Sequence, residues 1–357
     1  MEHRELISIF DQFEHGAKFE SYSELNSGHI NDTYLVKTTQ KPYYVLQRIN
    51  HIVFKDVPGL ISNKVNVSRH ISNKLTHVSD AEIERSVLSF VNAKDGKFYH
   101  IDEDGNYWNM MVFIDESQTF ETVKEKEIAY EGGKLFGNFL NLASDFDAAK
   151  LTEVIPNFHN MLFRFRQFED ALKVASSERL EKAKSLLKRV EELKEEMLIL
   201  QHLKDKGKIK LRVTHNDTKI SNALFDMDNK GLCVIDTDTV MPGIIHYDFG
   251  DAIRTICNTA AEDEKKLELV NFNLEYYNAY AKGFLEEIGS SLTALEKKYL
   301  PLGAKTMIFI MALRFLTDYL NNDIYYKTEY PEHNLNRSKN QFKLIESFEK
   351  YFEPEKV

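Results

Sequence analysis

A short stretch near the middle of the chain combines carboxylates and an amide at a spacing suited to phosphoryl transfer. Asp217 follows His215 and is followed five residues later by Asn222, and an apolar run at 232–235 leads into Asp236. Phosphoryl transfer needs a carboxylate to orient the attacking hydroxyl and oxygen ligands to hold a metal against the nucleotide phosphates. Because this stretch offers both, it predicts the working centre of a kinase.

Each of these side chains has a predicted role. Asp217 is the candidate catalytic carboxylate, which orients the acceptor hydroxyl and accepts its proton. Asn222 and Asp236 are candidate magnesium ligands, because a hard cation needs only a few protein oxygens and keeps several waters. A hairpin around the turn-forming run 226–231 is expected to return Asp236 to Asn222. Asp238 points the same way on extended backbone, and either a second metal ion or a nearby backbone group is its expected partner.

Simpler explanations exist for single members of this set. An isolated Asp in a loop usually caps a helix or closes a turn, and this is our interpretation of Asp226 and Asp228. The Asp-x-Asp at 236–238 also matches the metal-binding motif of nucleotide-sugar transferases, but three residues are a weak signal. His-x-Asp-x4-Asn, followed at hairpin distance by an Asp after a buried strand, is more specific. We therefore favour phosphotransferase chemistry.

The patterns around this stretch divide the chain into two regions. Before residue 115, short strands, a helix at 56–77 and a hairpin turn at 104–106 predict a small antiparallel sheet with one helix. After residue 115, nearly everything except 211–240 has a helical pattern, and the apolar steps at 180–200 indicate a helix packed on its own domain. We predict an α+β fold with an N-terminal lobe at 1–114 and a larger, mainly helical C-terminal lobe at 115–357.

Composition and charge argue against several classes of protein. The chain has 357 residues, 43% of them hydrophobic, and a formal net charge of -10, which predicts a substantial core and disfavours nucleic-acid binding. The start has no uninterrupted apolar stretch of the signal-peptide type, and the most apolar segment, 307–316, is too short to span a bilayer. Cys233 and Cys257 belong to no Cys-x-x-Cys or Cys/His cluster. We expect a cytoplasmic protein without membrane or nucleic-acid partners, as a monomer or a weak homo-oligomer.

The central motif resembles the aminoglycoside phosphotransferase and choline kinase superfamily. The resemblance rests on residues 215–222, 235–236 and 247–251, the last reading Tyr-Asp-Phe-Gly-Asp. It implies a two-lobed, protein-kinase-like fold over nearly the whole chain, with ATP as co-substrate and Mg²⁺ as cofactor. By position, it gives Asp217 the catalytic role, assigns Asn222 and Asp236 to magnesium, and makes Asp248 a structural anchor. Asp238 stands where protein kinases carry the glycine of Asp-Phe-Gly, which is a departure from the protein-kinase pattern.

The same resemblance identifies a candidate nucleotide loop near the N-terminus. A lone glycine between two strands normally marks only a turn. The stretch Gly28-x-x-Asn31-x-Thr33-Tyr34 is, however, similar to the phosphate-covering loop of the superfamily. It implies that Gly28, Asn31 and Thr33 bind the nucleotide through backbone amides and small polar side chains.

The third strand lacks the expected phosphate-binding lysine and carries Gln47 and Arg48 instead. Arg48 is our candidate, because a guanidinium is permanently charged and can grip two phosphate oxygens, and choline kinases resemble this pattern in using Arg. The alternative, an Arg48 that faces solvent, depends on the strand register. Adenine is expected at the junction of the lobes, where the backbone around Phe113 and Ile114 can pair with the ring edge.

The acceptor site is expected in the helical lobe around Arg314. This charge interrupts an apolar segment and is costly there unless it is paired or lines a cleft. A local ion pair with Asp318, one helical turn away, is the simpler explanation. The following polar and aromatic tail, together with residues 45–50 and 214–219, is similar to N-acetylhexosamine 1-kinases, which phosphorylate the anomeric hydroxyl of GlcNAc or GalNAc. That resemblance makes Arg314 and Tyr325 candidate sugar contacts, with His29 and Asn31 as weaker ones.

Three functions compete at this point. The leading prediction is an ATP- and Mg²⁺-dependent sugar 1-kinase of amino-sugar salvage that works by direct in-line transfer. The second is a kinase of another small hydroxyl compound, such as choline, which calls for an aromatic cage, homoserine, or an aminoglycoside, which calls for a strongly acidic cleft. The third is a nucleotide-binding pseudokinase, suggested by the missing strand lysine but disfavoured by the intact Asp217, Asn222 and Asp236.

Overall fold

The apolar alternation of the N-terminal region forms a five-stranded antiparallel sheet in the order β1-β2-β3-β5-β4. The computed structural model describes residues 3–25 and 30–352. Side chains on one face of the sheet, including Leu46 and Trp108, pack against Phe10 of the first helix. The strands are β1 (Phe19–Glu24), β2 (Asp32–Thr38), β3 (Tyr44–Ile49), β4 (His100–Ile101) and β5 (Tyr107–Val112).

Three helices accompany this sheet, α1 (His3–Phe10), α2 (Val57–Lys74) and α3 (Asp80–Ser86). The helix predicted at 56–77 is α2, and the carboxylate of Asp56 caps it by accepting from the Gly59 amide at 2.9 Å. The other two were not expected, because seven or eight residues are too few for a helical apolar repeat to stand out. Ile49 and the apolar side of α2 form a second small core.

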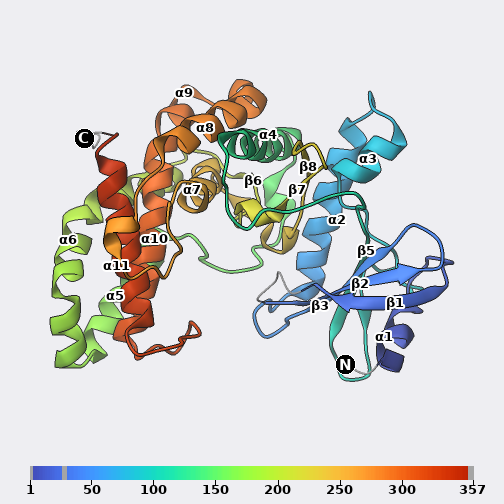
Figure 1. Cartoon of the computed structure of the whole chain (residues 1–357), viewed down its shortest axis with the longest axis horizontal. Helices are drawn as coiled ribbons and strands as arrows, with labels where there is room; N and C mark the ends of the chain where they lie inside the picture. The colour runs from blue at the N-terminus through green and yellow to red at the C-terminus, as the bar shows by residue number, and fades with distance from the viewer. Residues whose placement is uncertain (1–2, 26–29, 353–357) are drawn as a thin grey trace.

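The C-terminal part is mainly helical and forms the larger lobe (Figure 1). Helices α5, α6, α10 and α11 stand together at the end farthest from the sheet. This arrangement confirms the predicted two-lobed α+β fold, and it confirms that the 180–200 repeat belongs to a helix packed on its own lobe. The helices are α4 (Lys126–Leu142), α5 (Met161–Val174), α6 (Ser177–Asp205), α7 (Ile245–Ile256), α8 (Leu274–Ile288), α9 (Ala294–Lys298), α10 (Leu300–Leu320) and α11 (His333–Glu349).

Helix α10 forms the centre of this lobe. Among the described residues it is the one helix long and apolar enough to cross a membrane by length and composition, yet 78% of its apolar window is buried inside the protein. It contacts α5, α6, α7 and α11. Burial on several sides accounts for its nearly continuous apolar sequence, because a helix without a solvent face has no need of polar residues.

Short strands and turns fill the region between the sheet and the helices. β7 (Ala223–Phe225) pairs with β8 (Gly231–Val234), which confirms the predicted hairpin. β6 (Arg212–Thr214) pairs with β9 (Met241–Gly243). Two single-turn 3₁₀ helices lie at the predicted site residues. Ile220–Asn222 ends with Asn222, and Thr237–Thr239 begins directly after Asp236. Helix α2 lies between this region and the sheet (Figure 1).

Close packing of α4 against α8 provides a test of the fold. A Cβ atom on Gly133 would lie 2.2 Å from the carbonyl oxygen of Tyr280, so the two backbones must separate to admit it. We expect Gly133→Ala to lower the free energy of unfolding by about 2 kcal/mol, measured by urea denaturation. Gly289→Ala is the matched control, because its Cβ would meet Leu285 only at 3.9 Å. Equal stability of the two variants would contradict this packing.

Candidate active site

The loop after β6 is held by the buried imidazole of His215. Its Nδ1 accepts a hydrogen bond from the Asp217 amide at 3.3 Å, so Nε2 carries the proton and donates to the Ile235 carbonyl at 2.9 Å. The neighbouring Asn216 has a φ of 65°, a left-handed conformation that Asn tolerates better than most residues. His215 therefore fixes the turn that presents Asp217 and ties it to the end of β8.

The side chain of Asp248, on α7, anchors the same loop. Its two carboxylate oxygens accept hydrogen bonds from the backbone amides of His215 at 2.7 Å and Asn216 at 2.8 Å. Burial raises the pKa of Asp248 to about 6, and the positive ends of these amides oppose that rise. Thr218 adds a hydrogen bond from its hydroxyl to the Asp248 carbonyl at 2.5 Å. The Asp248 carboxylate thus accepts hydrogen bonds from two buried loop amides that have no backbone acceptor among the described residues.

Replacing Asp248 with Asn is expected to damage both stability and turnover. An amide offers one acceptor oxygen, so one of the two loop N–H groups would face an NH₂ group, at a cost of about 2 kcal/mol. We expect a lower melting temperature and a fall in kcat of about tenfold or more. Circular dichroism and steady-state kinetics measure both quantities. Asp228→Asn, at an exposed hairpin turn, is the control, and unchanged kinetics in the Asp248 variant would remove the anchor role.

Asp217 and Asn222 lie within hydrogen-bonding distance of each other. The Asn222 Nδ2 donates to the Asp217 carbonyl at 2.8 Å and to its Oδ2 at 2.9 Å. Among the described residues, no donor reaches the other carboxylate oxygen, Oδ1, and about a third of the Asp217 side chain is exposed, 33%. The Asn222 Oδ1 is likewise uncommitted. The pair therefore offers one oxygen to an acceptor hydroxyl and one amide oxygen to a metal.

The hairpin returns Asp236 to this pair, as the sequence predicts. The Ile235 amide donates to the Asn222 carbonyl at 2.9 Å, and the next residue, Asp236, has a left-handed φ of 55°. Burial raises the pKa of Asp236 to about 7, and the carboxylates of Asp238 and Asp217 add to the rise. Crowded carboxylates of this kind are stabilised by a cation. The donor set therefore fits a hard divalent metal.

No cluster of three or more His, Cys, Asp or Glu side chains forms a complete metal cage in residues 3–25 and 30–352. The amide oxygen of Asn222 and the carboxylate of Asp236 would therefore hold a metal together with waters and nucleotide phosphates. Mg²⁺ is usually bound in this way in phosphoryl-transfer sites. Metal binding by these two residues stays a prediction.

Lys219 is a site residue that the motif analysis did not single out. Its Nζ lies 3.2 Å from the Asp217 Oδ2. Burial alone would lower the pKa of Lys219, but the nearby carboxylates of Asp217 and Asp236 outweigh burial and raise it. The ammonium is therefore charged and lies beside the candidate base. Its position two residues after Asp217, on a loop, was the available signal.

The structure brings some of the N-terminal candidates close to the metal-ligand candidates and leaves others apart. Thr33 is the cross-strand partner of Gln47, so both side chains lie on the same face of the sheet. Asn31 donates a hydrogen bond to the Asp238 carboxylate. This bond links the predicted nucleotide loop to residues 236–238, called the metal loop below. Gly28 and His29 lie outside the described residues.

Arg48 does not join the other candidates. It neighbours Gln47 along β3 and therefore faces the opposite side of the sheet. There its guanidinium pairs with the carboxylate of Asp32, and both side chains are well exposed. The guanidinium also lies 5.9 Å from the centre of the Trp108 ring. A one-residue difference in facing places Arg48 on the face opposite Gln47 and Lys64, which corrects the predicted phosphate contact.

The segment predicted to contact adenine joins the two lobes. The Phe113 amide donates to the Tyr43 carbonyl at 2.9 Å. Within the described part of the chain, the Phe113 carbonyl and the Ile114 amide have no hydrogen-bond partner. The two groups belong to one trans peptide unit and point in opposite directions, so one of them at a time can face a ring edge. Adenine contact by the backbone around Phe113 and Ile114 stays a prediction.

Arg314 lies in an aromatic cluster rather than in the ion pair with Asp318. Its guanidinium lies 5.5 to 5.9 Å from the ring centres of Phe158, Tyr325 and Tyr326. Asp318 instead accepts from the amides of Tyr325 at 2.8 Å and Tyr326 at 2.9 Å. The exposed ring of Tyr325, 72% accessible, leaves one side of the cluster open to solvent.

Two further residues lie beside this cluster, and one of them, His159, contacts the loop that carries Asp217. The Nε2 of His159 lies 3.4 Å from the Asn216 carbonyl, next to Asp217, and burial, followed by the charge of Arg314, lowers its pKa to about 3. Arg164 donates to the Phe158 carbonyl at 2.6 and 3.2 Å, and burial and Arg314 lower its pKa to about 10. Among the described residues, neither Arg164 nor Arg314 has a carboxylate partner. A charge within the aromatic run at 158–168 was the signal for Arg164.

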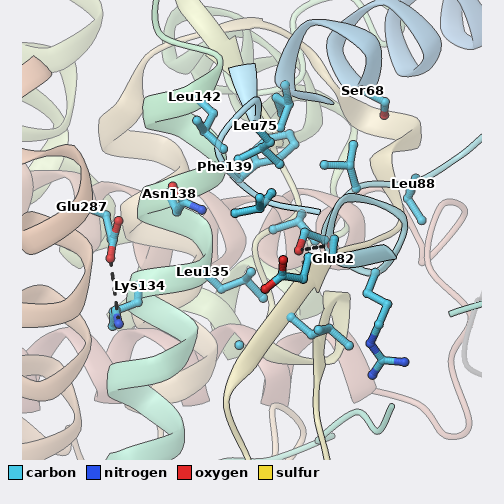
Figure 2. A pocket seen from close by; sticks show the side chains of 18 of the residues that line it. Ser68, Leu75, Glu82, Leu88, Lys134, Leu135, Asn138, Phe139, Leu142 and Glu287 are labelled. Carbon is cyan, nitrogen blue, oxygen red and sulfur yellow. Dashed lines mark hydrogen bonds and ion pairs between the residues drawn. The ribbon is translucent and has the colours of Figure 1, made fainter. Parts of the chain in front are cut away.

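A cavity of about 520 Å³ lies on another side of the central region, between α2, α3, α4 and β8. Figure 2 shows Leu75, Glu82, Leu135 and Phe139 among the side chains that line it. Of the metal loop, only Thr237 lines this cavity. Asp217, Asn222 and Asp236 do not line it.

Comparison with known proteins agrees with this geometry. The model of a family described as the phosphotransferase enzyme family matches residues 21–283. A structure of aminoglycoside phosphotransferase from Alicyclobacillus acidocaldarius is similar with a TM-score of 0.64 at 12% identity, covering 96% of this chain and 95% of that one. Amicoumacin kinase in complex with AMP-PNP, Ca²⁺ and its ligand matches with a TM-score of 0.62 at 13% identity, covering 97% and 94%.

Choline kinase from Cryptosporidium parvum is also similar, with a TM-score of 0.55 at 14% identity, covering 96% of this chain and 92% of that one. At these identities the solved structures establish the shared fold.

Proposed function

The chain belongs to the phosphotransferase enzyme family, and from this premise we propose that it is an ATP- and Mg²⁺-dependent kinase of an N-acetylhexosamine, GlcNAc or GalNAc. The product is the sugar 1-phosphate, formed by direct in-line transfer to the anomeric hydroxyl in the cytoplasm, as a step of amino-sugar salvage. In this proposal residues 1–114 hold the nucleotide and residues 115–357 supply the catalytic groups and the acceptor site. The family match over residues 21–283 supports the phosphotransferase class.

The catalytic part of the proposal assigns one role to each side chain. Asp217 orients the anomeric hydroxyl through its free Oδ1 and accepts the proton late, because an anomeric hydroxyl is more acidic than an ordinary alcohol. Asn222 and Asp236 would hold magnesium, which supplies charge neutralisation at the transferred phosphoryl group. Lys219 places a positive charge beside the Asp217 carboxylate. Phe113 and Ile114 pair with the adenine edge through backbone groups.

The positive charge around Arg314 is the observation on which the proposed acceptor rests. Arg164 and Arg314 are two cations without carboxylate partners among the described residues, and each is close enough to lower the pKa of the neutral His159. Cationic acceptors such as choline and aminoglycosides would be repelled there, because like charges in a poorly solvated site cost several kcal/mol. Guanidinium groups instead donate hydrogen bonds to hydroxyl and acetamido oxygens. Aromatic rings beside them suit a sugar face.

A panel of acceptors tests this function. ADP release is measured with GlcNAc, GalNAc, other free sugars, choline, homoserine and an aminoglycoside, and the product is identified by phosphorus NMR. We expect turnover with an N-acetylhexosamine and a phosphate on the anomeric carbon. Turnover confined to choline, homoserine or an aminoglycoside, or phosphate on a primary alcohol, would overturn the acceptor assignment. Nucleotide binding without turnover on any acceptor would favour a pseudokinase.

The acceptor site itself is tested with Arg314→Met, which keeps the length of the side chain and removes its charge and donors. We expect the KM for the sugar to rise by about 10- to 100-fold, because hydrogen bonds to a charged donor are worth about 1.5 to 3 kcal/mol. The KM for ATP should stay within about threefold. Arg166→Met, at an exposed position of α5, is the matched control. A rise in the KM for ATP alone would place Arg314 with the nucleotide.

A further inference from the structure

A buried lysine on α2 occupies the centre of the space between the sheet and the metal loop. Lys64 is only 2% exposed. Its ammonium pairs with the carboxylate of Asp238, which is 3% exposed, and donates to the Gln47 Oε1 at 3.2 Å. Burying an ammonium is costly unless it is paired, so the Lys64–Asp238 pair forms against a considerable desolvation cost.

The pairing reverses the arrangement of protein kinases. In those enzymes a lysine on the third strand binds phosphate oxygens and is held by a glutamate on the following helix. Here the third strand, β3, carries the neutral Gln47, and the helix, α2, carries the cation. Because the Gln47 oxygen and the Lys64 nitrogen are 3.2 Å apart, the positive charge lies next to the end of the strand side chain.

The surroundings of Lys64 are those expected of a phosphate site. Asp238 also accepts a hydrogen bond from Asn31, which precedes β2 at the end of the predicted nucleotide loop. Lys64 is close enough to Asp236 that its charge opposes the rise of the pKa of that carboxyl. Strand β3, the nucleotide loop and the metal loop therefore meet around one ammonium. An ammonium has three donors, and Gln47 and Asp238 use two of them.

We propose that Lys64 is the cation that this kinase directs at the nucleotide phosphates, delivered from α2 instead of β3. Asp238 is its counter-ion and takes the part of the usual helix glutamate, while Gln47 orients the ammonium. The inference rests on the proposed nucleotide dependence and names a residue for it. It also accounts for the second carboxylate of the Asp-x-Asp segment, which then holds a lysine and not a second metal ion.

A structural brace is the competing explanation, because the ion pair joins α2 to the metal loop. Three variants separate the two roles. Lys64→Gln removes the charge. Lys64→Gln with Asp238→Asn removes both charges and leaves no buried ion unpaired. Lys64→Gln with Gln47→Lys returns the ammonium to the strand, where it reaches the same place.

ATP and ADP affinity is measured by titration calorimetry and stability by thermal unfolding. We expect Lys64→Gln to weaken ATP binding by about 10- to 100-fold, with the sugar KM within threefold, and to lower the melting temperature. The variant with Asp238→Asn should regain stability without regaining ATP affinity. The variant with Gln47→Lys should return to within about fivefold of the wild-type affinity. Lys305→Gln is the matched control, a buried lysine paired with Glu196 at 2.6 Å far from the cleft; it should lose stability alone.

Two outcomes would overturn the assignment. ATP affinity unchanged in Lys64→Gln would mean that the ammonium does not reach the phosphates. ATP affinity restored together with stability by Asp238→Asn would mean that Lys64 is only a brace. Failure of the wild-type protein to bind ATP or ADP at all is a distinct result, because it would overturn the proposed function itself and this assignment with it.

Discussion

Asp217→Asn is expected to lower kcat by about a thousandfold while ATP still binds with nearly wild-type affinity. In the proposed mechanism the carboxylate accepts the proton of the acceptor hydroxyl through Oδ1, and positioned bases of this kind contribute about 10²- to 10⁴-fold. An amide of the same shape keeps the side-chain volume, so the loop held by His215 and Asp248 should stay in place. The expected change is therefore in the chemical step and not in nucleotide binding.

Steady-state kinetics with saturating ATP and sugar measure the loss, and calorimetry with ATP measures binding. Asp170→Asn is the matched control, because Asp170 is an exposed carboxylate of α5 that pairs only with Lys173. Turnover within tenfold of wild type in Asp217→Asn would show that another group accepts the proton. Loss of ATP binding would show that the residue serves the nucleotide instead.

Local patterns predicted the parts of the site that lie close together in sequence. Asp217, Asn222 and Asp236 come together because a short hairpin and its turn were readable from the apolar strands and the polar run between them. The left-handed backbone of Asn216 and Asp236 was not predicted. Long-range hydrogen bonds stabilise it, such as the one from the Asn216 amide to Asp248 thirty-two residues away.

The cation that we propose for the nucleotide phosphates could not be identified from the strand alone. A shift of one residue moves a side chain to the other face of a sheet, and the sequence did not fix whether Gln47 or Arg48 faces the helix. Lys64 was visible in another way. It falls on the apolar stripe of α2, four residues after Leu60 and three before Val67, and a charge in such a stripe indicates a buried partner.

The aromatic cluster around Arg314 was visible in part from the sequence, for a similar reason. Arg314 stood out as a charge in an apolar run, and the same argument applied to Arg164 would have found it. His159 had no such signal, because its importance comes from contact with the Asn216 carbonyl, fifty-seven residues away. Contacts between distant segments depend on how helices pack, and a single sequence contains no direct record of them.

Asp236→Asn is expected to abolish turnover and, at the same time, to stabilise the metal-free protein. The carboxylate is buried among Asp217 and Asp238, and burial together with these charges raises its pKa to about 7. No donor among the described residues hydrogen-bonds to its side chain. Without a cation the charge is therefore unfavourable, and a neutral amide should increase the free energy of unfolding by roughly 1 kcal/mol.

The same substitution removes the negative ligand that a divalent metal needs, so we expect kcat to fall by about a thousandfold or more. ATP affinity should no longer respond to added Mg²⁺. Thermal unfolding in EDTA, calorimetry with and without Mg²⁺, and kinetics measure the three effects, with Asp226→Asn in the hairpin turn as the control. A variant that loses activity but is also less stable in EDTA would mean that Asp236 supports the fold. Higher stability together with lost activity is the result expected of a site that binds an external cation. A carboxylate that supports the fold would give the opposite result, because its replacement would lower the free energy of unfolding.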